Sequence, residues 1–227
     1  MDERLILGKT IADVFIVESL RMADERDHRY EGRRLADILR MAGKKPKYFY
    51  YEEKSELPHL LKIFKESKYR FFHMSAHASL DKIYTNKDFF TYPEFAQMCK
   101  GYLKERRAFF SACELGNEIF TFCLSGTNKG MHSIVAPAEE IQFDHAAAIW
   151  SAFYVSVFAA NSQSMRHVDI ISRLKILGSL FPVDFHFSGY APKPDKWNHQ
   201  LIKKSSASPI LGPIKGNELL EDSPVTI

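Results

Sequence analysis

Two short segments place reactive side chains at the ends of apolar runs. "FFHMSAHAS" carries His73 and His77, and "AFFSACELG" carries Cys113. A thiol becomes a nucleophile as the thiolate, and its ordinary pKa of about 8.5 leaves little thiolate at neutral pH. A histidine, with an ordinary pKa near 6.5, can take the thiol proton and later return it to a leaving group. The two segments therefore predict covalent catalysis by a cysteine with a histidine base.

The elements that must position these residues follow an alternating pattern. Strand-like runs are expected at 12–17, 47–51, 69–77, 107–113, 131–137 and 183–189, with helical patterns between most of them. This pattern predicts an α/β sandwich around a mostly parallel six-stranded sheet. In such sheets ligands bind beyond the carboxyl ends of the strands, and consecutive strands are usually neighbours. His77 and Cys113, at the ends of the third and fourth strands, are expected to lie close together.

The remaining elements give further expectations. Helices are predicted at 92–104, 143–160 and 163–178, and a short helix at 117–124 with Ile119, Phe122 and Cys123 facing inward. The proline- and serine-rich end of the chain lacks such periodicity. We therefore predict one domain over residues 1–190, followed by a tail over 191–227.

Composition narrows the class of protein. The 227 residues are 45% hydrophobic and 26% charged, as in a soluble globular domain whose core needs no disulfide or metal. A net charge of +3 is mild, so direct nucleic-acid binding is not expected. No signal peptide or membrane-spanning stretch is expected, and three cysteines without close spacing favour a reduced, cytoplasmic location. The spacing of "HMSAH" lacks the glutamate of helical zinc peptidases, so neither a metal nor another cofactor is expected.

Together, the two reactive segments resemble the paired signatures of the caspase-like cysteine peptidases, and most closely the CHAT branch. The following "GMHSIVAPAEEIQFDHAAAIWSAFYVSVFAA" resembles the next strand, acidic loop and helix of that branch, and the resemblance spans about residues 12–190. It implies a caspase-like three-layer α/β/α sandwich with His77 and Cys113 as the catalytic dyad. It also implies an oxyanion hole formed by the backbone N–H groups of Ala78 and Cys113.

Two positions depart from the family pattern. Ala78 stands where the family usually has glycine, and Leu115 stands where it usually has threonine. An alanine tolerates fewer backbone conformations than glycine, and a positive φ there would cost about 1 kcal/mol. Ala78 therefore motivates an alternative function, a catalytically inactive scaffold that binds a protein partner through the former substrate groove.

The resemblance also bears on substrate and partners. Ser111, two residues before Cys113, occupies a position that helps to form the primary specificity pocket in caspases and metacaspases. Its small, uncharged side chain favours a neutral or apolar substrate residue, unless acids from other loops, Glu18 among them, supply a charge. Glu139 and Glu140 are further candidates for substrate binding. The family implies a protein substrate, an activating partner or oligomerisation, and an effector role in signalling such as anti-phage immunity or regulated cell death. A serine hydrolase is a poor fit because no GxSxG segment is present.

Overall fold

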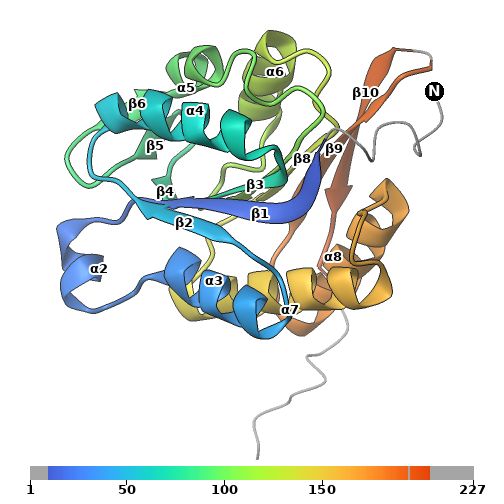
Figure 1. Ribbon diagram of the computed structural model, residues 1–227, viewed down its shortest axis with the longest axis horizontal. Helices are drawn as coiled ribbons and strands as arrows, with labels where there is room; N and C mark the ends of the chain where they lie inside the picture. The colour runs from blue at the N-terminus through green and yellow to red at the C-terminus, as the bar shows by residue number, and fades with distance from the viewer. Residues whose placement is uncertain (1–9, 194, 205–227) are drawn as a thin grey trace, which may run out of the picture.

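The architecture is a three-layer sandwich around one mostly parallel sheet (Figure 1). The structure, a computed structural model, describes residues 10–193 and 195–204. Its seven-stranded sheet has the order β10-β9-β8-β7-β3-β1-β2. The strands are β1 (Ile11–Glu18), β2 (Lys47–Tyr50), β3 (Tyr69–Ser75), β7 (Arg107–Ser111), β8 (Ser133–Pro137), β9 (Phe185–Ala191) and β10 (Lys196–Ile202). The first five run parallel to one another, whereas β9 and β10 are antiparallel to their neighbours.

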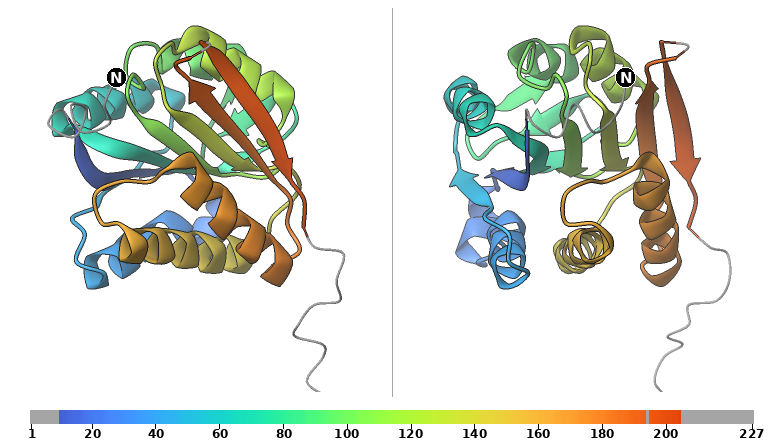
Figure 2. Two further views of the ribbon diagram at one scale, coloured as in Figure 1. Left: turned by 90° about the vertical axis from the view of Figure 1, so that its right-hand side faces the viewer. Right: turned by 45° about the vertical axis from the view of Figure 1, so that its right-hand side comes forward.

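Helices cover both faces of this sheet (Figures 1 and 2). One layer contains α3 (Glu31–Met41), α7 (Phe143–Ala160) and α8 (His167–Leu180), and the other contains α4 (Leu57–Ser67), α5 (Tyr92–Met98) and α6 (Glu118–Thr127). Shorter elements are α2 (Met22–Arg26), the 3-10 turn η1 (Lys54–Glu56), and a small sheet of β4 (His77–Ala78), β5 (Lys82–Tyr84) and β6 (Phe89–Thr91).

Successive side chains of β3 point to opposite faces of the sheet, and the sheet therefore separates two hydrophobic cores. Phe72 and Met74 are fully buried on the α4–α5–α6 side, whereas Phe71 is fully buried on the α3–α7–α8 side. Burying each such side chain contributes roughly 1.5–3 kcal/mol. His73 has the parity of Phe71 and contacts Trp150 of α7, so it is a fully buried neighbour of the second core.

The predicted fold class is confirmed, with one strand more than expected. The seventh strand, β10, lies within residues that we assigned to the tail. Its side chains are mostly exposed at the sheet edge, so it lacks the apolar run that identifies a buried strand. Residues 205–227 of the predicted tail lie outside the described residues, and the domain boundary stays a prediction.

Two helix predictions were wrong in detail. The helix expected at 92–104 ends at Met98, and Gly101, with a φ of +81°, follows in the left-handed region that favours glycine. In α6, Ile119 and Phe122 are 65% and 77% exposed, while Phe120 and Leu124 face the core. The side chain of Asn117 accepts a hydrogen bond from the N–H of Phe120 and so fixes where the helix begins.

The helix α7 accounts for a further difference from expectation. It is long and apolar enough, by length and composition alone, to cross a membrane. Trp150, Phe153 and Tyr154 are nevertheless fully buried in the core between this helix and the sheet. Core helices of globular proteins meet the same test, and packing against the sheet explains the apolar composition of α7.

Candidate active site

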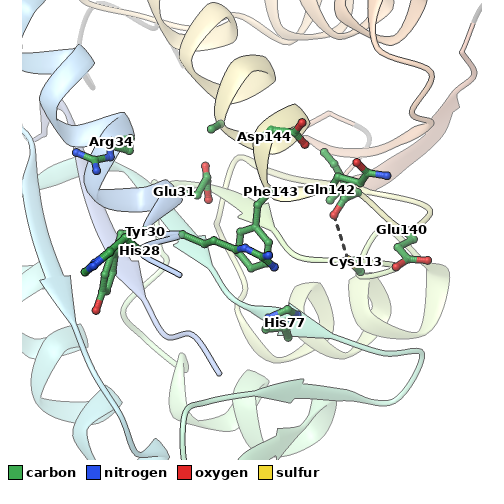
Figure 3. Close-up of a pocket in the computed structure, with 13 residues that line it drawn as sticks. His28, Tyr30, Glu31, Arg34, His77, Cys113, Glu140, Gln142, Phe143 and Asp144 are labelled. Atoms are coloured by element: carbon green, nitrogen blue, oxygen red, sulfur yellow. Dashed lines mark hydrogen bonds between the residues drawn. The ribbon is translucent and has the colours of Figure 1, made fainter. Parts of the chain in front are cut away.

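The register of β3 and β7 brings the two reactive residues to one cavity. Ser75 pairs with Ser111 at the ends of these parallel strands, and the N–H of Ala76 donates to the carbonyl of Ser111. His77 and Cys113, two residues after Ser75 and Ser111, line the same cavity of about 630 Å³ (Figure 3). The other lining residues come from the α2–α3 segment and from the β8–α7 loop with the first turn of α7: His28, Arg29, Tyr30, Glu31, Arg34, Glu140, Ile141, Gln142, Phe143, Asp144 and Ala147.

His77 is held by a carboxylate that the sequence did not single out. Oδ2 of Asp24 lies 2.7 Å from Nε2 of His77, and Oδ1 lies 3.2 Å from the guanidinium of Arg29. Asp24 is buried, so water screens this contact little. When Nε2–H donates to the carboxylate, Nδ1 becomes the nitrogen that can accept a proton. No described residue hydrogen-bonds to Nδ1, which is therefore available for a thiol proton.

The β8–α7 loop and the first residue of α7 contact the two reactive side chains. Sγ of Cys113 donates to the carbonyl oxygen of Ile141 at 3.6 Å. The ring of Phe143 lies edge-on against the ring of His77, with 5.3 Å between the ring centroids. The thiol hydrogen is thus directed to a backbone carbonyl, and it must rotate before the imidazole can receive it.

The backbone at Ala78 answers the question raised by its departure from glycine. Ala78 lies in β4, where it pairs with Ile83 of β5, and it is absent from the described residues with positive φ. An alanine adopts this extended conformation without strain. Among the described residues, no carbonyl accepts a hydrogen bond from the N–H of Cys113. Neither Ala78 nor Cys113, the residues whose N–H groups are expected in the oxyanion hole, has a positive φ.

The turn after Cys113 has the strained position instead. Glu114 has a φ of +58°, and its N–H donates to the carbonyl of Glu139. The N–H of Gly116 donates to the carbonyl of Pro137 at 2.6 Å. A Cβ atom at Gly116 would lie 2.6 Å from the carbonyl oxygens of Ala136 and Pro137, so only glycine allows this turn to pack against β8.

The predicted substrate-binding residues have different fates. Ser111 lines a narrow extension of the site next to Cys113, and Glu140 lines the main cavity with its side chain exposed. Glu139 does not line either space. Its carboxylate instead accepts hydrogen bonds from Nζ of Lys204 at 2.8 Å and from the N–H of Asp184 at 2.7 Å.

Two buried acids lie behind the cavity. Glu18, at the end of β1, accepts hydrogen bonds from the N–H of Gly32 at 2.7 Å, the N–H of Arg33 at 3.3 Å and the hydroxyl of Tyr48 at 2.7 Å. Burial, aided by the negative charge of Glu31, raises the pKa of Glu18 to about 7. Glu18 therefore binds the first turn of α3 and does not line the cavity. Glu31, which sequence reasoning missed, does line it.

The described residues, 10–193 and 195–204, contain no group of three or more His, Cys, Asp or Glu side chains that could hold a metal ion.

Comparisons with known proteins identify the fold. No protein-family model matches the chain, and none of the curated proteins matches it in sequence. Among solved structures, a secreted C11 cysteine protease from Bacteroides thetaiotaomicron ("iotapain") aligns with a TM-score of 0.54 and 8% identity, over 79% of this chain and 66% of its own. The fold is that of a caspase-like cysteine protease.

Two further structures are similar at lower scores. Caspase-1 from Spodoptera frugiperda aligns with a TM-score of 0.48 and 13% identity over 86% of this chain and 87% of its own. The complex of the pro- and mature domains of RgpB from Porphyromonas gingivalis aligns with a TM-score of 0.48 and 12% identity over 75% of this chain and 43% of its own. The present chain thus spans just under two thirds of the C11 protease and less than half of the RgpB chain.

Proposed function

We propose that the protein is a cysteine endopeptidase in which Cys113 is the nucleophile and His77 is the general base and acid. One observation carries this proposal: two adjacent parallel strands deliver His77 and Cys113 to one cavity, and Asp24 holds Nε2 of His77 at 2.7 Å. A buried carboxylate on the far nitrogen is the arrangement that orients an imidazole and stabilises it once it is protonated. The fold supports the same reaction class.

The reaction begins when Nδ1 of His77 takes the proton of the Cys113 thiol. The thiolate attacks the carbonyl carbon of the scissile peptide, and the N–H groups of Cys113 and Ala78 stabilise the negative oxygen of the tetrahedral intermediate. His77 then protonates the leaving amine as the C–N bond breaks, which leaves a thioester on Cys113. A water molecule, deprotonated by His77, hydrolyses this thioester and regenerates the thiol. Asp24 acts throughout as a positioning residue.

We further propose that the substrate is one or a few protein partners and that the enzyme requires activation. The contacts of Ile141 with the Cys113 thiol and of Phe143 with the His77 ring support a requirement for rearrangement. A separate partner or oligomerisation is the expected trigger. A CHAT-type effector role in the cytoplasm, such as anti-phage immunity or regulated cell death, rests on the resemblance of the motifs.

Covalent labelling tests the nucleophile. A peptidyl acyloxymethyl ketone should form an adduct on Cys113, detected by intact mass and peptide mapping, and Cys113→Ala should form none. Cys123→Ala is a matched control, because Cys123 is also a partly buried thiol but lies on α6. The alternative, an inactive scaffold, predicts the same labelling in the wild type and in Cys113→Ala.

A further inference from the structure

Glu31 presents a buried carboxylate without a hydrogen-bond partner to the candidate active site. Its side chain is 1% exposed, and neither Oε1 nor Oε2 has a partner among the described residues. The nearest basic atom is Nε2 of His73, 3.7 Å from Oε1, and this nitrogen also lacks a partner. A buried carboxylate in this state is costly, since burial removes its hydration without replacing it. The structure therefore has a strong acceptor that its own residues do not satisfy.

A slot of small side chains connects this carboxylate to the nucleophile. A space of about 30 Å³ is lined by Glu31 together with Cys113 and His77. Besides Ile141 and Phe143, the rest of the lining is small: Ser75, Ala76, Ser111, Ala112 and Ala146. The slot is narrow, and it adjoins the larger cavity that Glu31, His77 and Cys113 also line. In Figure 3 the ring of Phe143 lies between Glu31 and His77, so movement of this ring is what would widen the slot.

We infer that Glu31 binds the positively charged end of an arginine or lysine side chain in the residue that precedes the scissile bond. This inference rests on the proposed endopeptidase function. A guanidinium or ammonium group would supply the hydrogen bonds and the charge that both carboxylate oxygens lack. The unbranched methylene chain of either residue suits a slot lined by alanine and serine. The small side chain of Ser111 then leaves space for the substrate side chain and adds no charge. The inferred preference for a basic substrate residue differs from the neutral or apolar preference expected from Ser111 alone.

The basic residues around the cavity do not oppose this assignment. Arg34 is exposed at the cavity edge, where water and salt screen its charge. Arg29 is paired with Asp24 at 3.2 Å and with Asp27 at 3.0 Å. Glu31 is the buried acid that lines the slot, and burial strengthens its interaction with a bound cation.

The experiment compares peptidyl acyloxymethyl ketones that differ only in the residue next to the warhead: arginine, lysine, citrulline, leucine or aspartate. Citrulline has nearly the shape of arginine but no charge. We expect the second-order rate of Cys113 modification to be about 10²-fold higher for arginine than for citrulline. Glu31→Gln should reduce this ratio to within about threefold of unity, and Glu31→Asp, which keeps the charge, should retain most of it. Asp37→Asn, a carboxylate-to-amide change on the exposed face of α3, is the matched control and should leave the ratio unchanged.

The outcomes separate this inference from the proposed function. Equal rates for arginine and citrulline in the wild type, or an unchanged ratio in a Glu31→Gln variant that unfolds as cooperatively as the wild type, would overturn the role of Glu31 while leaving the nucleophile intact. Failure of every probe to modify Cys113 in the oligomeric fraction and in cells that co-express candidate partner proteins, when iodoacetamide does modify it, contradicts the endopeptidase function itself. If Glu31→Gln does not fold, the Glu31→Asp variant decides: loss of the ratio with this charge retained in folded protein contradicts the inference.

Discussion

Two acid–histidine pairs lie within one small region of this protein, and they differ in almost every physical respect. His77 is partly exposed and lines the cavity, and the buried Asp24 is hydrogen-bonded to it at 2.7 Å. Glu31 and His73 are fully buried and lie 3.7 Å apart without a hydrogen bond. Both acids come from the segment that contains α2 and α3. His73 lies in β3, and His77 follows in β4. The first pair is complete in the free protein, whereas the second leaves the carboxylate unsatisfied.

The difference shows how similar residue types serve unlike roles. A hydrogen-bonded pair next to solvent can pass its proton to another group and recover it from water, which suits acid–base catalysis. A buried, unsatisfied carboxylate is poorly placed to exchange protons with water but binds an arriving cation strongly. Substitutions that affect one pair and spare the other test this separation directly.

The largest effect should come from the histidine of the first pair. We expect His77→Asn to lower the rate of Cys113 modification by peptidyl acyloxymethyl ketones about 10³-fold, since the general base is lost. His73→Asn should lower this rate less than about tenfold and should instead reduce the free energy of unfolding by about 1–3 kcal/mol, because Nδ1 of His73 bonds to the hydroxyl of Tyr154. Labelling kinetics and urea denaturation measure the two quantities. Equal losses of labelling in both variants would contradict the separation of roles.

A smaller effect is expected from the acid of the first pair. Asp24→Asn should lower the labelling rate about 10²-fold, because the amide no longer stabilises the imidazolium that forms during the reaction. Asp27→Asn is the matched control, since it removes the other carboxylate that pairs with Arg29. Asp27→Asn removes an exposed ion pair and should change neither the melting temperature nor the labelling rate appreciably, so only Asp24→Asn should lose rate. A rate loss shared by Asp27→Asn would mean that Arg29, and not the contact with His77, is the important partner.

The smallest effect concerns pH and Glu18, the buried acid whose pKa depends on the charge of Glu31. The pKa of Glu18 is about 7 in the folded protein against an ordinary 4.5, so the folded state holds more protons than the unfolded state between these values. The contribution of Glu18 to stability should therefore fall as pH rises, by about 2 kcal/mol between pH 5 and pH 8. Burial lowers the pKa of His132 and His167 to about 4, and these groups have the opposite effect over the same range, so the quantity to measure is the difference in slope between the wild type and Glu18→Gln. Glu18→Gln should remove this contribution, so that the stability of the variant rises more steeply with pH than that of the wild type. Glu31→Gln should reduce the contribution of Glu18, because the negative charge of Glu31 helps to raise the pKa of Glu18. Urea denaturation at several pH values measures the slope, and Glu66→Gln, on the exposed side of α4, should not change it.

The sequence was sufficient to predict the strands that carry His77 and Cys113. Apolar runs with helical patterns between most of them specify a mostly parallel sheet, and residues at the carboxyl ends of neighbouring strands must meet. Asp24 and Glu31 could not be predicted in this way. They belong to the polar stretch "ESLRMADERDHRYEGRR", in which acids and bases alternate without a period that would separate Asp24 from Asp27. The path of this loop across the end of the sheet decides which acid reaches which histidine.

Backbone conformation was the second limit. The substitution of glycine by Ala78 suggested a handicap only if φ were positive there, and that angle depends on the pairing of β4 with β5, which no sequence pattern revealed. The left-handed residue is Glu114, whose conformation follows from the packing of the turn against β8. The edge strand β10 was not predicted because its side chains are mostly exposed and do not form an apolar run.

Glu139 gives this arrangement a mechanical consequence. Its carboxylate holds Lys204, just beyond β10, and its carbonyl holds the N–H of Glu114, next to the nucleophile. The glutamate sits in the same loop as Ile141, whose carbonyl receives the thiol hydrogen. A force applied to the chain at Lys204 is thus transmitted by Glu139 to the turn of Cys113. Through the same loop it also reaches Ile141, whose carbonyl accepts the hydrogen bond of the thiol. Tension at one edge of the sheet can therefore change the position of the reactive sulfur, some 90 residues away in sequence, through the hydrogen bonds of Glu139.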